Sequence, residues 1–480
     1  MKIDAFDLVV VGAGMAGLTA AVRAAEFGMR VCVLEQGVTE DYPCNTRYSG
    51  GIFHLAYHSV SRPRRELESI LERATFGQAD PGLISTLAEH APRLTAWLSK
   101  QGATFIRGGA AEWCTWMLAP PRKLSAGLDW RGRGPDTLLH ALGARLLALS
   151  GALVLGARAT RLRMQQDGCT GVDVEIDGAA RTISADAVVL ADGGFQGNPE
   201  MVGTYVSRRP EALMQRGAGT GRGDALRMAL EVGAQATRAD RFYGRLLSRD
   251  AFTRPGLWPF PEVDAIGAAG VLVDAAGHRF ADEGRGGIAL ANAVAQLDNP
   301  LSATLIFDQA IWDGPGRSAR TPANPNVVLE GGTLVTAATL HDLAVKLEIP
   351  PAQLESTVKQ YNAAVDAGAL ATLIPPRSSN TYAPLPIHGP VFHAMPVCAG
   401  ITYTMGGICI DAHARVLRAN GDFIPGLYAA GSCTGGLEGG ERIGYTGGLV
   451  RAGVFALRAA ECAHARAAQL RADGAKVSHA

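Results

Sequence analysis

The first 35 residues carry two short apolar runs separated by a glycine-rich turn and a segment of helical texture. The first run covers 6–11 and passes directly into the turn at 12–17. The second run covers 31–34 and ends in Glu35. Short apolar runs closed by glycine or a polar residue are typical of buried strands, so the pattern predicts a strand, a turn, a helix and a parallel strand.

Further along the chain, helical and β-rich stretches alternate. Apolar side chains recur at helical spacing over 63–101 and over 137–149, which predicts helices there. A β-rich passage follows, with predicted strands at 152–155, 159–164, 170–176 and 185–191. The last of these is apolar and closed by glycines, as a central strand of the same sheet would be.

The pattern of apolar and polar residues changes over 235–375. We expect a strand, turn and strand at 270–280, a further strand at 303–307, and two helices at 337–347 and 351–367. After this region we expect an apolar strand at 427–431 and an alanine-rich helix at 447–468, as in the first part of the chain. The economical architecture is one nucleotide domain built from 1–234 and 376–480, with a cap inserted between them.

The glycine turn has the spacing of a dinucleotide site. Gly12 permits a tight turn, Gly14 lets the backbone approach a pyrophosphate, and Gly17 lets the helix pack against the sheet. Glu35 is placed to accept hydrogen bonds from ribose hydroxyls, and the helix N-terminus favours an anion. Because all four parts occur in order, we prefer a dinucleotide site to a simple packing turn.

Composition narrows the class of protein. The 480 residues favour two to three domains, and 45 Lys plus Arg balance 45 Asp plus Glu, so no basic field for nucleic acid exists. The eight cysteines form neither CxxC nor CxxCH, which argues against structural zinc, iron–sulfur clusters and haem and suggests a reducing cytoplasm. Asp7 interrupts the first apolar run, and 146–157 is too short for a bilayer. We therefore expect a cytoplasmic protein without stable membrane insertion.

Four stretches, taken in order, resemble the flavoprotein family of succinate dehydrogenase and fumarate reductase, with soluble members such as tricarballylate dehydrogenase. They are 45–51, 219–224, 277–283 and the interrupted stretch 404–442. The resemblance implies FAD as the cofactor. It also implies an α/β fold, in which a Rossmann-like FAD-binding domain carries an inserted α+β capping domain.

The glycine turn and the resemblance together give a set of predicted FAD-binding residues, most of them small or short and polar. They are Gly12, Gly14, Ala16, Gly17, Glu35, Asn45, Thr46, Arg47, Ser49, Gly50, Gly51, Ala159, Asp192, Gly193, Gly194, Asp224, Gly431 and Gly447. For Asp224 a helix N-cap is an equal alternative, because an apolar segment follows it directly.

Hydrogen transfer across a C–C bond beside a carboxylate requires a cation for the acyl oxygens and a proton donor. Arg442 matches by position the arginine that binds the substrate carboxylate in fumarate reductases. The alternative is a surface arginine paired with Glu441 or Glu438. Arg285 lies two residues before the place of the family's proton-delivering arginine, so it fills that role with a shifted backbone or the role is absent.

Two substrate-binding histidines of fumarate reductases are missing. Tyr403 stands directly before the Thr-Met-Gly-Gly run where those enzymes have one histidine, so we expect a substrate other than fumarate. Ahead of the cap, Tyr243 and Arg245 are candidate substitutes for the second histidine, with ordinary cap packing as the alternative.

Cys44 lies within a residue or so of the family's covalent flavin attachment, so a thioether link is an alternative to the commoner free, buried cysteine. His54 and His58 have the spacing of a metal pair on a helix, but no acidic residue accompanies them. We expect packing in a helix or cofactor loop, and no metal.

The sequence thus predicts an FAD-dependent oxidoreductase that transfers hydride between flavin N5 and a C–C or C=C bond beside a carboxylate or ketone. A tricarballylate-like acid, another conjugated acid or an enone is the expected substrate, and the electron donor or acceptor is expected to be external. The rival interpretations are a flavin protein for electron transfer or redox sensing, without a cation above the flavin, and a flavin oxidase of another class.

Overall fold

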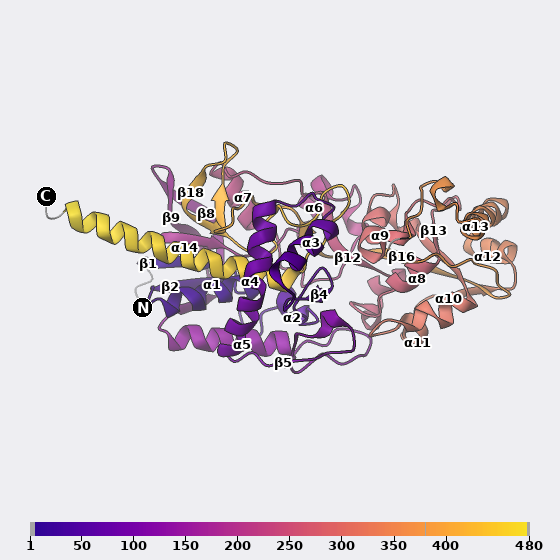
Figure 1. Ribbon diagram of the computed structural model, residues 1–480, viewed down its shortest axis with the longest axis horizontal. Coiled ribbons are helices and arrows are strands. Elements are labelled where there is room, and N and C mark those ends of the chain that lie inside the picture. The colour runs from indigo at the N-terminus through magenta and orange to yellow at the C-terminus, as the bar shows by residue number, and fades with distance from the viewer. Residues whose placement is uncertain (1–4, 380, 478–480) are drawn as a thin grey trace.

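Two β-sheets lie at opposite ends of an elongated molecule in the computed structural model (Figure 1). The structure describes residues 5–379 and 381–477, and only the backbone of 473–477. The eight-stranded sheet lies at the end where both termini are found, and the six-stranded sheet lies at the other end. The mixed α/β composition agrees with the predicted fold class.

The predicted strand–helix–strand unit is confirmed. It consists of β1 (Ala5–Val11), α1 (Met15–Glu26) and β2 (Val31–Glu35). β1 pairs in parallel with β2 on one side and with β10 (Ala179–Leu190) on the other. Because β1 is central, its residues 8–10 are fully buried, as the apolar run predicts.

The order of the eight-stranded sheet is β17-β18-β10-β1-β2-β7, and β8 and β9 branch from β10 as an antiparallel extension. The added strands are β7 (Ala152–Leu155), β8 (Ala157–Gln165), β9 (Gly168–Ile176), β17 (Arg415–Leu417) and β18 (Phe423–Ala429). β18 pairs in parallel with β10, which returns the C-terminal part of the chain to the first sheet.

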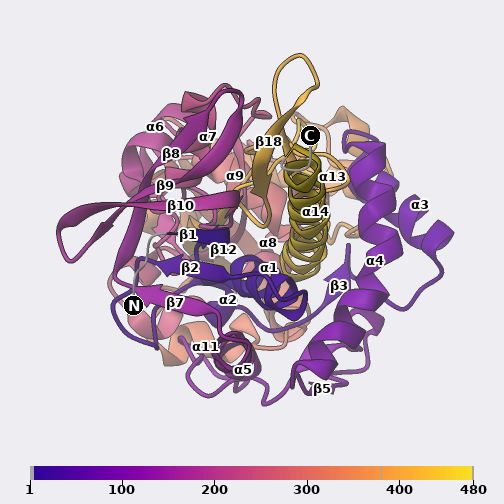
Figure 2. The same cartoon turned by 90° about the vertical axis from the view of Figure 1, so that its left-hand side faces the viewer.

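Helices cover this sheet. α14 (Gly448–Val477) lies between α1 and α4 (Pro81–Lys100), as Figure 2 shows from the end of the molecule. The helical stretch predicted at 63–101 is two helices, α3 (Arg64–Ala74) and α4, because Phe76 and Gly77 adopt positive φ values of 54° and 68° between them. α5 (Gly134–Ala148) packs beside α1.

The six-stranded sheet is built around β16 (Phe392–Met405), which pairs with four of the other strands. These are β11 (Met214–Gln215), β12 (Arg241–Ser248), β14 (Thr304–Asp308) and β15 (Val335–Ala337), and β13 (Val271–Val273) extends the sheet beyond β14. Its helices include α8 (Asp264–Ala269), α9 (Gly287–Ala295), α12 (Leu340–Leu347) and α13 (Pro351–Asp366).

One prediction in this region needs correction, and two of its strands lacked any prediction. The predicted second strand at 277–280 is wrong, because only a single bridge joins Arg279 to Val273 and the Arg279 side chain is held in a buried ion pair with Glu283. β12 and β16 were not predicted at all. Strands β12 to β15 fall inside the predicted cap and β11 and β16 outside it, so the domain limits stay a prediction.

The remaining helices and strands are short. They are α2 (Asn45–Tyr48), β3 (His54–Leu55), β4 (His58–Ser59), β5 (Phe105–Ile106), β6 (Met117–Leu118), α6 (Pro199–Tyr205), α7 (Asp224–Glu231), α10 (Gln309–Asp313) and α11 (Ala323–Leu329). In 5–379 and 381–477, no helix combines the length and apolar character needed to cross a bilayer.

A register shift in β16 ties the two halves of the molecule together. Tyr243 of β12 lies opposite Tyr403, but the next residue, Gly244, lies opposite Ile401, so Thr402 is left without a partner in the ladder. Its carbonyl oxygen instead accepts a hydrogen bond from Asn45 Nδ2 at 2.8 Å. The bulge therefore docks the second sheet onto α2, beside the first glycine turn.

Candidate functional site

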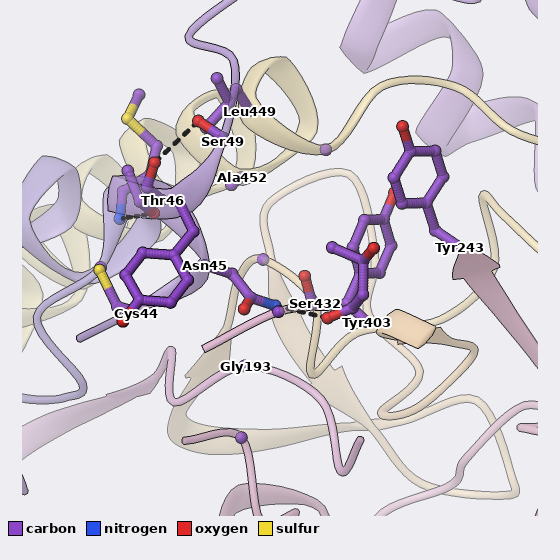
Figure 3. A pocket seen from close by; sticks show the side chains of 18 of the residues that line it. Cys44, Asn45, Thr46, Ser49, Gly193, Tyr243, Tyr403, Ser432, Leu449 and Ala452 are labelled. Atoms are coloured by element: carbon purple, nitrogen blue, oxygen red, sulfur yellow. Dashed lines mark hydrogen bonds between the residues drawn. The ribbon is translucent and has the colours of Figure 1, made fainter. Parts of the chain in front are cut away.

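A cavity of about 790 Å³ extends from the first glycine turn to the wall where the two halves of the molecule meet. Fourteen of the predicted cofactor-binding residues line it, from seven separate parts of the chain. They are Gly12, Gly14, Ala16, Glu35, Asn45, Thr46, Ser49, Gly50, Gly51, Ala159, Asp192, Gly193, Asp224 and Gly431. A close view of part of this wall is given in Figure 3.

The glycine turn has the predicted geometry. Gly12 has a φ of 97°, and a Cβ there would lie 2.6 Å from the carbonyl oxygen of Ala191. At Gly17 a Cβ would lie 1.8 Å from the Gly12 oxygen, so this glycine serves close packing within the turn. Gly14 is different, because its Cβ would meet only Thr46 Oγ1, at 3.5 Å, and would point into open cavity space.

Two side chains complete this turn. Glu35 accepts hydrogen bonds from the Ala13 nitrogen at 2.9 Å and the Gly37 nitrogen at 2.8 Å. Burial nevertheless raises the pKa of Glu35. Thr46 Oγ1 accepts from the first helical N–H, that of Met15, at 3.0 Å (Figure 3). The following N–H groups of α1 have no acceptor within the helix, which leaves them for an anion.

Unpartnered acceptors on the cavity wall indicate a ligand with hydroxyl or amino donors. Asp192 Oδ1 and Gln196 Oε1 are buried and have no hydrogen-bond partner in the protein. Both residues line the cavity. FAD offers ribose and ribityl hydroxyls, an adenine amine and an anionic pyrophosphate, so these acceptors and the open helix N-terminus fit that cofactor.

Burial raises the pKa of Asp192 to about 7, with the Asp224 and Glu35 carboxylates adding to the shift. In the pH interval between about 4 and about 7, folded flavin-free protein therefore holds a proton that the unfolded chain releases. The free energy of unfolding then falls as the pH rises through this interval.

We expect urea unfolding of the flavin-free protein to show this dependence. Between pH 5 and pH 7 the wild type should lose about 2 kcal/mol more stability than Asp192→Asn, because a raised carboxyl pKa contributes up to about 1.4 kcal/mol per pH unit. Other titrating groups act alike in both proteins. Parallel pH profiles for the two would show that Asp192 is already ionised at pH 5.

Four predicted cofactor residues are not among those that line the cavity. Gly17 and Gly194 are packing positions, and Gly447, with a φ of 126°, lies against the His54 carbonyl oxygen. Arg47 is 1 % exposed, and its guanidinium donates to the carbonyl oxygens of Glu40 and Tyr42 and forms an ion pair with Asp136. Their roles in cofactor binding stay predictions.

The N-cap alternative for Asp224 is wrong, since Gly223 with a φ of 77° takes the N-cap position of α7. Asp224 opens the helix and lines the cavity. Its two carboxylate oxygens accept from Arg158 Nε at 2.9 Å and Nη2 at 3.0 Å.

Four tyrosines cluster at the end of the cavity near the six-stranded sheet. The ring of Tyr243 stacks on that of Tyr403, with centroids 5.0 Å apart, and on that of Tyr445, at 4.8 Å. Tyr57 packs against Tyr445 at 5.5 Å. The first pair follows from the register, because Tyr243 and Tyr403 lie directly opposite on β12 and β16 (Figure 3).

Arg245 connects this tyrosine cluster to two carboxylates. Its Nη2 donates to the hydroxyl oxygens of Tyr57 at 2.9 Å and Tyr243 at 3.0 Å. Its Nη1 donates to Asp264 at 2.9 Å, and its Nε lies 3.8 Å from Glu262. Tyr243 and Arg245 share a face of β12, and both line the cavity.

Tyr403 is held from behind by a buried charge pair. Its hydroxyl donates to Glu438 Oε2 at 3.0 Å, and Arg451 Nη2 lies 3.3 Å from the same oxygen. Glu438 Oε1 accepts from the backbone N–H groups of Thr446 and Gly447. Burial and the Glu438 charge raise the pKa of Tyr403, so the phenol is neutral at physiological pH.

Arg442 and Arg285 lie away from the cavity wall. Gly439 and Gly444 exchange backbone hydrogen bonds across a tight turn, which projects Arg442 outward. Its exposed guanidinium lies 4.3 Å from the ring centroid of Phe76. Arg285 donates to the carbonyl oxygen of Arg442, and neither residue is among those that line the cavity. Their predicted catalytic roles stay predictions that the geometry does not favour.

Cys44 lines the cavity, and burial raises the pKa of its thiol to about 11.

His54 and His58 belong to the short hairpin of β3 and β4 and not to a helix, so the metal-pair spacing has no structural counterpart. The His54 ring stacks on Tyr57 at 5.1 Å, and burial lowers its pKa to about 4, which keeps it neutral.

Sequence reasoning named Tyr243, Tyr403 and Arg245 but missed several other residues of this wall. These are Tyr57, Tyr445, Arg122, Arg216, Glu262 and Arg320. A signal existed for Tyr445, which stands two residues before the predicted Gly447. The others lie in loops without a motif, and only the fold brings them to the cavity.

A comparison of the sequence with protein-family models identifies the cofactor. A family model described as FAD binding domain matches residues 7–447. This match confirms the predicted cofactor, FAD.

Named relatives are similar over most of the chain. It is 26 % identical to the fumarate reductase (cytochrome) of Shewanella frigidimarina, over 92 % of this chain and 74 % of that protein. It is 29 % identical to the NADH:acrylate oxidoreductase of Vibrio harveyi, over 77 % of this chain and 35 % of that protein. The chain thus spans about a third of the acrylate enzyme.

A solved structure agrees in fold. The 3-ketosteroid delta1-dehydrogenase of Sterolibacterium denitrificans superposes with a TM-score of 0.74 at 21 % identity, covering 96 % of this chain and 100 % of that chain. At this identity the likeness concerns the fold, which confirms the predicted flavoprotein architecture.

Proposed function

Because the chain belongs to the FAD binding domain family of flavoproteins, of the succinate dehydrogenase and fumarate reductase type, we propose that it oxidises or reduces a carbon–carbon bond. The bond lies next to a carboxylate or ketone. When bound, FAD supplies hydride transfer at N5. The substrate is a conjugated organic acid or enone, and the electron donor or acceptor is a separate molecule.

One observation carries this proposal: a single cavity joins the cofactor wall to a wall of converging polar groups. The first glycine turn and Arg245 with its tyrosines lie on the same surface. A small molecule bound beside the cofactor would therefore meet a guanidinium and phenol hydroxyls.

We assign separate roles to these groups. Arg245 orients the acyl oxygen and stabilises the negative charge that develops on it, which is the role first predicted for Arg442. Tyr243 or Tyr57, whose hydroxyl oxygens are held by Arg245, exchanges the proton at the substrate carbon. Tyr403 donates its single hydroxyl hydrogen to Glu438, so it is a positioning residue whose stacked ring holds the Tyr243 phenol in place.

The electron-transfer rival predicts a cavity without converging polar groups near the flavin. Arg245 and the four tyrosines argue against it, because electron transfer alone does not require polar side chains that hold a carbon substrate. The relatives' names agree with carbon chemistry, since one acts on acrylate and another on fumarate.

Anaerobic reoxidation of the reduced flavin distinguishes the two functions. The holoenzyme is photoreduced, and crotonate, cinnamate, fumarate and cyclohexenone are added separately while the flavin absorbance is followed. We expect at least one unsaturated compound to restore the oxidised spectrum, and butyrate and cyclohexanone to have no effect. One of the variants Tyr243→Phe and Tyr57→Phe should slow the reaction by about 10²- to 10⁴-fold, because proton transfer loses its donor.

A one-electron oxidant such as ferricyanide serves as the control for a competent flavin. If ferricyanide reoxidises the protein and a wide set of unsaturated acids and enones does not, the electron-transfer function stands and the carbon chemistry is contradicted.

Acid precipitation of the same preparation tests Cys44, since a covalent flavin would stay with the protein pellet.

A further inference from the structure

Two arginines on the cavity wall have no carboxylate partner among the described residues. Arg122 donates to Thr321 Oγ1 at 2.8 Å and to the Lys123 carbonyl oxygen, and its guanidinium lies over the Phe260 ring at 3.5 Å. Arg320 contacts Cys114 Sγ at 3.7 Å and Met117 Sδ at 3.8 Å. Sulfur is a weak acceptor, so most donor capacity of Arg320 is unused.

The neighbouring arginines differ in this respect. Arg216 forms an ion pair with Glu262, and Arg245 forms one with Asp264. The two carboxylates are thus paired with Arg216 and Arg245, and neither Arg122 nor Arg320 forms an ion pair among the described residues. Arg122 and Arg320 are half-buried at the edge of the cavity, so a ligand anion could reach them and form charge-assisted hydrogen bonds.

The two unpaired arginines lie close to one another. Burial lowers the pKa of Arg122 to about 10, and the positive charges of Arg216 and Arg320 contribute to that shift. Arg122 comes from the loop before α5, and Arg320 from the loop before α11. The bond from Arg122 to Thr321 joins these loops, so the pair forms a defined wall and not two independent side chains.

This pair is separated from the tyrosine cluster by an ordered row of charges. Arg245 approaches Glu262, Glu262 binds Arg216, and Arg216 is the next cation toward Arg122. Arg216 is itself fixed, since its Nη1 donates to Thr402 Oγ1 at 3.1 Å. An anion at Arg122 and Arg320 is therefore not the acyl group that Arg245 orients.

We propose that Arg122 and Arg320 bind a carboxylate of the substrate that is remote from the reacting carbon–carbon bond. The inference rests on the proposed function, which it deepens by assigning a substrate class: an unsaturated acid or enone that carries a second, distant carboxylate. Phe260 beneath Arg122 provides an apolar surface for the part of the substrate between the two polar ends.

The test compares para-carboxybenzylideneacetone with its methyl ester, which differ in the charge at the end remote from the enone. Equilibrium binding to the oxidised holoenzyme is followed by quenching of tryptophan fluorescence, since Trp113 lines the cavity. We expect the acid to bind about 10- to 100-fold more tightly than the ester, as a charge-assisted hydrogen bond contributes about 1.5–3 kcal/mol.

The variants Arg122→Gln and Arg320→Gln should each abolish most of this preference and leave the affinity for the ester unchanged. Arg317→Gln is the matched control, because Arg317 is exposed, pairs with Asp313 at 2.9 Å and is not among the cavity-lining residues. It should keep the preference for the acid.

Equal affinity for acid and ester, failure of both to bind, or a preference that survives in both variants would overturn the proposal. Because binding is measured without turnover, an Arg320-dependent preference in a protein that reduces or oxidises no carbon compound would contradict only the proposed function. The two hypotheses therefore fail separately.

Discussion

Gly14→Val is expected to give a folded protein that purifies without flavin. The position has extended backbone angles, φ −76° and ψ −168°, which valine adopts without strain. Its side chain would enter the space above the N-terminus of α1 and exclude the pyrophosphate. Losing two charge-assisted hydrogen bonds at about 1.5–3 kcal/mol each weakens FAD binding by more than about 100-fold. The measurement is the flavin-to-protein absorbance ratio, with circular dichroism for the fold.

Gly143→Ala is the matched control for a glycine substitution. Gly143 lies inside α5, and a Cβ there would meet no atom within 4 Å. This variant should keep its flavin and gain roughly 0.5–1 kcal/mol of stability, because alanine suits a helix interior better than glycine. A Gly14→Val protein that retains stoichiometric FAD would contradict the placement of the pyrophosphate at α1.

The nucleotide half of the molecule was predictable because its signals are local. The turn from β1 into α1 is specified by three glycines within six residues, and the neighbouring strand ends in Glu35. Such a unit buries an apolar run on both faces of the sheet, so the pattern is continuous and strong. The FAD cofactor followed from the same local motif and its resemblance to known flavoproteins.

The strand β16 was not predictable, because no local signal marks it. It is buried along almost its whole length, so no alternation of polar and apolar residues marks it. It contains Pro396 and Gly400, which usually argue against a strand interior. The strand exists because β12, β14 and β15 pair with it from distant parts of the chain, which a local pattern does not reveal.

The site was predictable only in part. Tyr243 and Tyr403 were named for their place near known motifs, and the register of β12 and β16 brings them into contact. Arg442 was preferred as the cation because its position matches the family, whereas a tight turn projects it outward. Position along a motif indicates proximity of the backbone but not the direction of a side chain.

Arg245→Ala is expected to lower kcat/KM for any substrate found by the reoxidation screen by about 10²- to 10³-fold, the usual effect of losing a donor at a developing oxyanion. The same change removes the hydrogen bonds that hold the hydroxyl oxygens of Tyr57 and Tyr243. Burial raises the pKa of Asp264 to about 6, and loss of Arg245 raises it further, so a proton replaces the missing charge. The variant should therefore fold and hold FAD at pH 6, where its kinetics are measured.

Arg245→Lys and Arg249→Ala separate charge from geometry. Lysine keeps the positive charge but does not reproduce the planar fork that reaches both phenols and Asp264, so we expect a loss of about tenfold or more. Arg249 follows β12, is exposed and donates to the Leu301 carbonyl oxygen, so Arg249→Ala should behave as the wild type. If Arg245→Ala retains wild-type kcat/KM with full flavin occupancy, the acyl-binding cation lies elsewhere, and Arg442 becomes the next residue to test.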